Sequence, residues 1–261
     1  MFAWLRARRR ARLMAQPVPA SWDRIIDANV ALARGLTPDQ RRALSARVSA
    51  FIGATSWEGC GGLELTEEVQ VTIAAQACLL TLGRADDLYT DVESILVYPS
   101  TLVRPPRPLG LFEQPTAPVG HGTAILGEAM LRGPVVLAWD AVQAGGRGER
   151  PGNVVLHEFA HKLDMATGHI DGTPPLARRA DRTRWAEVCA RVYALHRARV
   201  DAGWATAMDP YGATNEAEFF AVATETYFTR PAELAWEHPD LYQVLADFYR
   251  LELAPGLVAA A

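Results

Sequence analysis

The sequence lacks the marks of several protein classes. Across its 261 residues, no apolar run approaches the roughly 18 consecutive residues that a membrane-spanning helix needs. The chain has no CxxC pair and no glycine-rich phosphate-binding motif. Its formal net charge is -4 and its pI is near 5.9, which argues against general affinity for nucleic acid. We therefore expect neither a membrane partner nor a direct nucleic-acid partner.

Cysteine is scarce as well. The chain has 3 cysteines, Cys60, Cys78 and Cys189, which lie far apart in the sequence. An odd number without metal-binding spacing is typical of small buried side chains in a reducing compartment rather than of disulfides. We therefore expect a cytoplasmic protein.

The N-terminal residues are basic but lack the apolar block of a secretory signal. Arginines are interspersed from Arg6 to Arg12, and no run of about 7 apolar residues follows them. We expect residues 1–18 to form a basic arm that can be disordered. The chain is 49% hydrophobic, enough for a sizeable core, so we expect residues 19–261 to form a single domain.

Hydrophobic spacing predicts a mostly helical domain. Apolar side chains recur at helical intervals in residues 25–32, 38–51, 69–82, 176–200, 215–228 and 239–251. Two short apolar runs, at 95–98 and 135–140, instead predict buried strands. The expected fold class is α+β, mostly helical with a small mixed sheet.

One stretch carries recognisable chemistry. His157-Glu158-Phe159-Ala160-His161 is an HExxH motif in an apolar segment. Residues four apart lie on one face of a helix, so His157 and His161 can bind a single zinc ion. Glu158 lies beside them, where its carboxylate can take a proton from a water at the metal. A chance motif on an ordinary helix is the alternative, although polar side chains in so apolar a helix would need partners.

A catalytic zinc needs a third protein ligand. The extended motif HExxHxxGxxH does not fit, because Asp164 and Thr167 stand where it needs glycine and histidine. His169 is eight residues after His161 and out of that register, so we interpret it as a surface or loop histidine. The remaining class of zinc peptidase uses a glutamate from a later helix.

The candidate glutamates are Glu187, Glu216, Glu218 and Glu225. Glu218 and Glu225 share a helix face, whereas Glu216 is about 200° from Glu218 and should meet solvent. We assign Glu218 as the third ligand and Glu225 as the acceptor of a hydrogen bond from a ligating histidine. Glu187, which has many charged neighbours, is the runner-up.

Tyr211 lies in a turn, Asp209–Gly212, just ahead of the helix that carries Glu218. A phenol at this place could donate to the oxyanion that forms when water adds to a peptide carbonyl. A tyrosine that merely packs in the turn is the alternative.

The strand that precedes the metal helix offers a substrate site. We expect Val135–Asp140 to form the edge strand of the sheet, above the HExxH helix, where unpaired backbone groups could hold an extended peptide as an added strand. The residues assigned to substrate binding are Val135, Val136, Leu137, Ala138 and Trp139.

Several separated motifs resemble the Mlc titration factor A family of zinc metallopeptidases. They are HEFAHKLD at 157–164, DPYGATNEAEFFAV at 209–222, IAAQACLL at 73–80, ILVYP at 95–99 and VVLAWD at 135–140. The resemblance runs from about residue 22 to about residue 250, with the motifs in the right order, and is more specific than HExxH alone.

The resemblance implies a zincin-like fold akin to the catalytic domain of anthrax lethal factor, with one zinc per chain on His157, His161 and Glu218. It implies Glu158 as general base and Tyr211 as the group that stabilises the transition state. It also implies aminopeptidase-type hydrolysis of peptides. The best-known members of the family bind Mlc, a sugar-responsive transcriptional repressor, and remove it from DNA.

Two functional hypotheses follow. In the first, the protein is a zinc-dependent peptidase that can also bind and inactivate an Mlc-like repressor in the control of sugar uptake. In the second, it is a non-catalytic regulatory protein that titrates a repressor and has a structural or vestigial zinc. The presence of Glu158 favours the first, because a structural zinc needs no adjacent base.

Overall fold

A computed structural model describes residues 2–86, 88–89, 91–104, 123–125, 127–131 and 133–253, with residues 2–7, 102–104 and 123–125 described by their backbone alone. The fold is α+β, mostly helical with one small mixed sheet, as the sequence predicted. None of the helices in these ranges is both long enough and apolar enough to cross a membrane.

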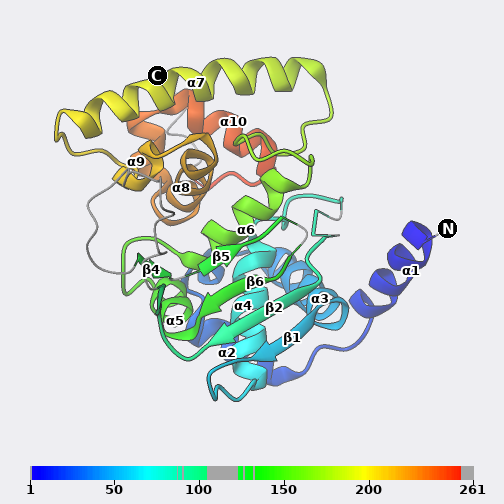
Figure 1. The fold of residues 1–261 in the computed structure, drawn as a ribbon. Coiled ribbons are helices and arrows are strands. Elements are labelled where there is room, and N and C mark those ends of the chain that lie inside the picture. Colours follow the sequence, from blue (N-terminus) through cyan, green and yellow to red (C-terminus); the bar gives the residue numbers. More distant parts are fainter. Residues whose placement is uncertain are drawn as a thin grey trace, which may run out of the picture.

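The small sheet has four strands in the order β1-β2-β6-β5 (Figure 1). They are β1 (Ser56–Gly59), β2 (Ser94–Tyr98), β6 (Val135–Ala138) and β5 (Gly127–Ala129). The first three run parallel, and β5 pairs with β6 in the antiparallel direction. The two apolar runs of the sequence form the two central strands, and both strands carry buried and partly buried side chains. A separate antiparallel pair consists of β3 (Leu102–Arg104) and β4 (Thr123–Ile125).

The prediction that Val135–Asp140 forms an edge strand is wrong. β6 pairs with β2 on one side and with β5 on the other, and Trp139 already begins helix α5 (Trp139–Arg147). Because both rows of its backbone groups are paired, β6 cannot hold a peptide as an added strand. Among the described strands, the free edge beside the metal helix belongs to β5. A Gly-Glu-Ala tripeptide has neither the length nor the alternation that identifies a strand in a sequence.

Helices of the N-terminal half pack around the sheet. They are α2 (Ala20–Asn29), the 3-10 helix η1 (Ala31–Gly35), α3 (Pro38–Ala54) and α4 (Glu67–Leu79). Helix α3 begins with a capping box, in which Thr37 and Gln40 each bond the other's backbone N–H. Every residue of α4 from Val71 to Leu79 is buried, so α4 forms the centre of the core.

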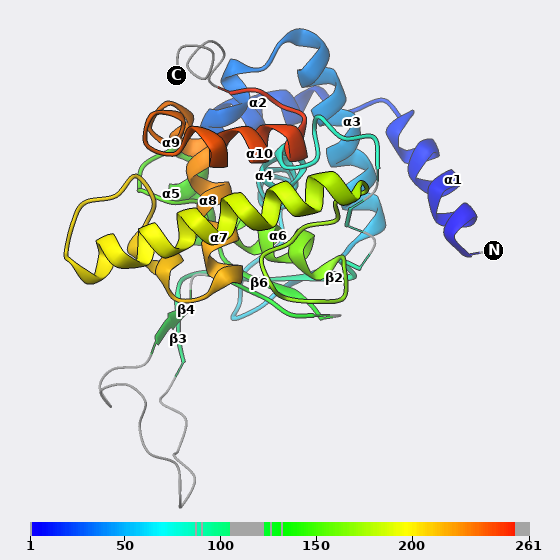
Figure 2. The same ribbon diagram turned by 90° about the horizontal axis from the view of Figure 1, so that it is seen from above.

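The basic N-terminal segment forms helix α1 (Phe2–Met14), which lies beside α3 at the periphery of the molecule (Figure 2). Arg9 donates to the backbone carbonyl of Gly53, and Ser49 donates to that of Leu13. This helix was not expected from the sequence. Alanine and arginine favour a helix, but an isolated helix of 13 residues is only marginally stable until it docks on a neighbour. The division of the chain into an arm and a domain stays a prediction.

The C-terminal half is helical and includes the helix that carries the HExxH motif, called the metal helix below. Its elements are α6 (Val154–Met165), α7 (Arg179–Asp201), the 3-10 helix η2 (Pro210–Ala213), α8 (Glu216–Thr229), α9 (Pro231–Glu237) and α10 (Pro239–Tyr249). Figure 1 shows α6 between the sheet and the helices α7 to α10. It packs against α8 and also against β5, α4 and α5. The HExxH helix therefore lies at the junction of the two halves.

The only lysine of the chain, Lys162, is fully buried in α6. Its Nζ donates to the backbone carbonyls of Met130 at 2.8 Å and Gly133 at 3.0 Å, between β5 and β6. Burial lowers the pKa of Lys162, an effect opposed by the negative charges of Asp91 and Glu93. Its ammonium group therefore connects α6 by hydrogen bonds to the loop between β5 and β6.

Lys162→Met should lower the free energy of unfolding by about 2–4 kcal/mol, because methionine fills the space but removes two charge-assisted hydrogen bonds to partly buried carbonyls. Urea unfolding followed by tryptophan fluorescence measures the change. Arg179→Met, at an exposed position at the start of α7, is the control and should cost less than about 0.5 kcal/mol. A loss no larger than the control's would show that solvent satisfies the two carbonyls.

Candidate metal centre

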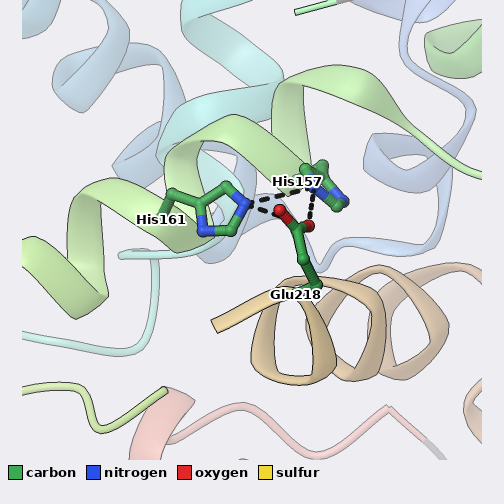
Figure 3. Close-up of side chains that lie close together, drawn as sticks. All are labelled: His157, His161 and Glu218. Carbon is green, nitrogen blue, oxygen red and sulfur yellow. Dashed lines mark hydrogen bonds and ion pairs between the residues drawn. The ribbon is translucent and has the colours of Figure 1, made fainter. Parts of the chain in front are cut away.

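Helix α6 begins where Asn153 caps it. The Oδ1 of Asn153 accepts a hydrogen bond from the Leu156 N–H at 3.0 Å, which sets the start of the helix three residues before the motif. His157 and His161 are one turn apart, and their Nε2 atoms lie 3.2 Å from each other. Both imidazoles therefore face the same side of α6 (Figure 3).

Glu218 reaches the two histidines from helix α8 (Figure 3). That helix is capped by Asn215, whose Oδ1 accepts from the Glu218 N–H at 2.9 Å. Glu218 Oε2 lies 3.0 Å from His157 Nε2 and 3.4 Å from His161 Nε2. Within the described part of the chain, this is the one group of metal-ligand side chains whose donor atoms converge, all within 4.8 Å.

The geometry of the three side chains fits a zinc ion. In a tetrahedral site with bonds of about 2.0–2.1 Å, neighbouring ligand atoms lie about 3.3 Å apart. The three separations of 3.0, 3.2 and 3.4 Å are close to that value. Two imidazoles and one carboxylate are also one of the ligand sets found in catalytic zinc sites, which keep a fourth position open.

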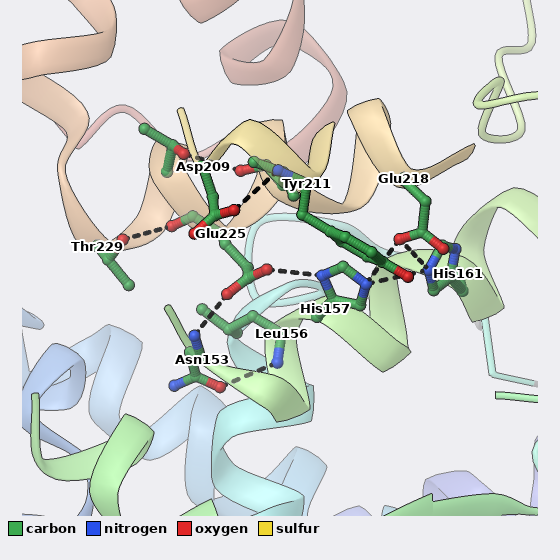
Figure 4. Close-up of polar contacts among 11 residues, drawn as sticks. Asn153, Leu156, His157, His161, Asp209, Tyr211, Glu218, Glu225 and Thr229 are labelled. Atoms are coloured by element: carbon green, nitrogen blue, oxygen red, sulfur yellow. Dashed lines mark hydrogen bonds and ion pairs between the residues drawn. The ribbon is translucent and has the colours of Figure 1, made fainter. Parts of the chain in front are cut away.

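Glu225 contacts the opposite side of the His157 ring (Figure 4). Its Oε1 lies 2.6 Å from His157 Nδ1, and its Oε2 accepts from the Asn153 N–H at 2.5 Å. When Nδ1 donates its proton to Glu225, the lone pair on Nε2 faces Glu218 and His161. Glu225 therefore contacts the ring of a candidate ligand, and its role in orienting that ring stays a prediction.

Asn153 connects this contact to the core. Its Nδ2 donates to Gln76 Oε1 at 2.7 Å, and the buried Gln76 amide donates to the carbonyl of Thr72 at 3.1 Å. Neither Gln76 nor the side-chain amide of Asn153 was predicted to take part in the site. A signal was present, because a single glutamine within the apolar stretch IAAQACLL must find hydrogen-bond partners if it is buried.

The convergence of carboxylates and imidazoles shifts their pKa values. Burial lowers the pKa of His157, but hydrogen bonds to Glu218 and Glu225 outweigh burial and raise that pKa to about 10. Burial raises the pKa of Glu218, but hydrogen bonds to His157 and His161 outweigh it and lower that pKa to about 2. Because a metal takes imidazole in its neutral form, metal uptake here must release a proton.

Glu158 lies between the converging donor atoms and strand β5. Its side chain is buried, and the backbone N–H of Ala129 donates to its carboxylate. A Cβ at Gly127 would lie 2.6 Å from Glu158 Cγ and 2.7 Å from Val154 Cγ2, so only glycine allows the strand to approach this closely. Burial raises the pKa of Glu158, which makes its carboxylate a stronger base.

Tyr211 lies in η2, where Asp209 Oδ1 accepts from its backbone N–H at 2.8 Å. Its ring centroid is 6.1 Å from that of His157, and 54% of the residue is exposed, so it does not pack in the core. Figure 4 shows its hydroxyl directed towards Glu218 and His161. Partial burial and the negative charges of Glu218 and Glu158 raise the pKa of the phenol, which keeps it protonated and able to donate.

Two clefts of about 330 Å³ each open beside the candidate ligands. The first contains Gly127, Glu158 and Tyr211, and the second contains Ala129 and Glu218. The clefts therefore meet β5 at its two ends.

The other candidate ligands do not join the group. His169 follows α6 in a loop, Glu187 lies in α7 and Glu216 begins α8, and all three are exposed. None has a donor atom in the converging set. Glu216 is exposed, as its helical phase relative to Glu218 predicted.

Comparison with known proteins identifies a family. Residues 4–250 match the family model described as glucose-regulated metallo-peptidase M90. An uncharacterized protein of Synechocystis sp. is 38% identical over 251 residues, which cover 94% of this chain and 88% of that protein. Proteins named Mlc titration factor A, from Yersinia pestis and Yersinia pseudotuberculosis, are 30% identical over 224 residues, which cover 82% of this chain and 78% of theirs. The resemblance noted in the separated motifs is confirmed, and the chain belongs to the glucose-regulated metallo-peptidase M90 family.

Proposed function

We propose that the protein is a zinc-dependent peptidase of the aminopeptidase type, with one zinc per chain on His157, His161 and Glu218. One observation carries the proposal: the buried carboxylate of Glu158 lies between the converging donor atoms and the free edge of β5. A purely structural zinc site would need neither such a base nor an adjoining cleft. Membership of a metallopeptidase family supports the same conclusion.

Each side chain of the site has a separate task in hydrolysis. A zinc ion held there would supply Lewis-acid chemistry, polarising the substrate carbonyl and lowering the pKa of water. Glu158 takes a proton from the attacking water and can pass it to the leaving amine. Tyr211 donates its hydroxyl hydrogen to the carbonyl oxygen, which becomes charged only in the transition state. Glu225 keeps His157 in the tautomer whose Nε2 faces the site.

Strand β5 takes the role that the sequence analysis gave to Val135–Trp139. It borders the first cleft through Gly127 and the second through Ala129, and its outer edge faces Glu158. An extended peptide can add to such an edge through main-chain hydrogen bonds, which tolerate varied side chains. A peptide bound there would pass directly over the candidate base.

A second candidate function rests on the names of the relatives. Proteins 30% identical to this chain are named Mlc titration factor A, so the chain could bind an Mlc-like repressor without hydrolysing it, the metal being structural or vestigial. The two functions can coexist in one protein that binds and inactivates a repressor. We propose no direct contact with nucleic acid, and a cytoplasmic location stays a prediction from the three cysteines, which form no disulfide.

Glu218→Ala should weaken zinc binding by about 100-fold or more. Loss of a ligand's hydrogen-bond partner typically costs about 10- to 100-fold in metal affinity, and this substitution removes one of the three ligands itself. Competition with a chromophoric chelator measures the affinity. Glu187→Ala, on the exposed face of α7, is the matched control and should bind one zinc per chain as the wild type does. Tight, stoichiometric zinc in Glu218→Ala would refute the assignment of the third ligand.

Glu158→Gln should retain its zinc yet lose peptide hydrolysis by about 10²-fold or more, since the amide has the carboxylate's shape but cannot accept a proton. Zinc analysis and a peptidase assay on the same preparation test both parts. Undiminished turnover would assign the activity to another group. The variant also separates the two candidate functions, because a repressor-titrating protein should still bind its repressor when hydrolysis is abolished.

Tyr211→Phe should keep zinc and KM but lower kcat by about 10²- to 10³-fold, the usual loss for one oxyanion donor. Steady-state kinetics at a fixed, saturating zinc concentration provide the comparison. If kcat stays within a factor of about two, the hydroxyl takes no part in catalysis and Tyr211 serves only as a wall of the cleft.

A further inference from the structure

The first cleft leads away from the candidate ligands towards two arginines. Arg150 precedes α6 and Arg230 lies between α8 and α9, and both line the cleft that contains Glu158 and Tyr211. An adjoining cleft of about 520 Å³ shares both arginines with the first. The two arginines therefore belong to the lining of both clefts.

Neither arginine is neutralised by a closely bonded carboxylate. Arg150 is exposed and, among the residues that the structure describes, it has no hydrogen bond or ion pair. The Arg230 side chain is 37% exposed and contacts Glu233, itself 58% exposed, at 3.4 Å. An exposed ion pair at this distance contributes little and exchanges readily.

Glu158, Asp209 and Glu225 are the acidic side chains of the first cleft, and they bond groups other than the two arginines, Glu158 accepting the backbone N–H of Ala129. One oxygen of Glu225 contacts His157, and the other accepts from the Asn153 N–H. Asp209 accepts the backbone N–H of Tyr211. The positive charge of the two guanidinium groups is therefore available to a bound molecule.

The position of the two arginines relative to β5 indicates which part of a bound peptide they would meet. The first cleft meets β5 at Gly127, its first residue, and the second cleft meets it at Ala129, its last. Antiparallel pairing is the more stable and more frequent arrangement of adjacent strands. A peptide added antiparallel to β5 runs from the second cleft to the first, so the residues on the C-terminal side of the cleaved bond approach Arg150 and Arg230.

We propose that Arg150 and Arg230 form a subsite for a carboxylate on the C-terminal side of the cleaved bond. The substrate class is a peptide that carries this carboxylate either on an acidic side chain or at its free C-terminus. Guanidinium groups suit this task because their paired N–H donors match the two oxygens of a carboxylate. The proposal rests on the proposed peptidase function, which it extends to substrate preference.

Peptide binding to zinc-loaded Glu158→Gln protein tests the subsite without turnover. The probes are alanine hexapeptides with a single Glu or Gln at successive positions, each made with a free C-terminus and as the C-terminal amide. Calorimetric titration gives Kd, and mass spectrometry of wild-type digests locates the cleaved bond. We expect a correctly placed carboxylate to lower Kd by roughly 5- to 20-fold, as charge-assisted hydrogen bonds do, and less at high salt.

Arg150→Gln and Arg230→Gln, each added to Glu158→Gln, should reduce or abolish this preference while zinc content stays unchanged. Arg179→Gln, which removes an exposed charge from the start of α7 outside both clefts, is the control and should keep it. A lower Kd for the Glu peptide than for the Gln peptide shows that the subsite binds a side-chain carboxylate. A lower Kd for the free C-terminus than for the amide shows that it binds a terminal carboxylate.

Three results would overturn the subsite: equal Kd values for all charged and neutral pairs, a preference that survives both arginine substitutions, or a preference only for carboxylates on the N-terminal side of the bond. Failure of the peptidase function would look different. In that case the wild type cleaves none of the peptides, while the binding measurements still report whether the arginines select a carboxylate.

Discussion

His157 is held between two carboxylates of a single helix, and the rest of the site depends on that arrangement. Glu218 lies 3.0 Å from its Nε2, and Glu225 lies 2.6 Å from its Nδ1. The two glutamates are about two turns apart on α8, so both project from one face of that helix. An imidazole can bridge them only because α6 packs directly against α8. The same packing brings the Nε2 of His161 to Glu218.

This group of charges is flanked by apolar side chains and is only slightly exposed, so most of its polar atoms need partners within the protein. The apolar residues of α6 and α8 that flank it, Val155, Leu156, Phe159, Ala160, Phe219, Phe220, Ala221 and Val222, are buried. An unpaired charge in such surroundings would be costly. The hydrogen bonds from Gln76 to Asn153 and from Asn153 to Glu225 meet that need at one end of the group. They also restrict the orientation of His157, which a metal site with fixed geometry requires.

The metal helix also positions the strand that borders the clefts. Lys162 follows His161 in the sequence, so adjacent side chains of α6 point in different directions. His161 faces Glu218, whereas Lys162 bonds the carbonyls between β5 and β6. On the same helix, Glu158 accepts the N–H of Ala129 and leaves no room for a side chain at Gly127. The helix that carries the candidate base thus fixes the distance to the strand that a substrate would meet.

The sequence by itself determined the features that act over a few residues: the mostly helical class, the shared face of His157 and His161, and the common face of Glu218 and Glu225. Helical phase repeats within one or two turns, so it can be read from a single segment. Only the tertiary structure decided that β5 rather than β6 has the free edge, because pairing is set by neighbours distant in the sequence and a three-residue strand has no periodicity. The contact of Asn153 with Gln76 spans 77 positions. Such contacts form only when helices pack, and a local sequence pattern does not show which helices pack against each other.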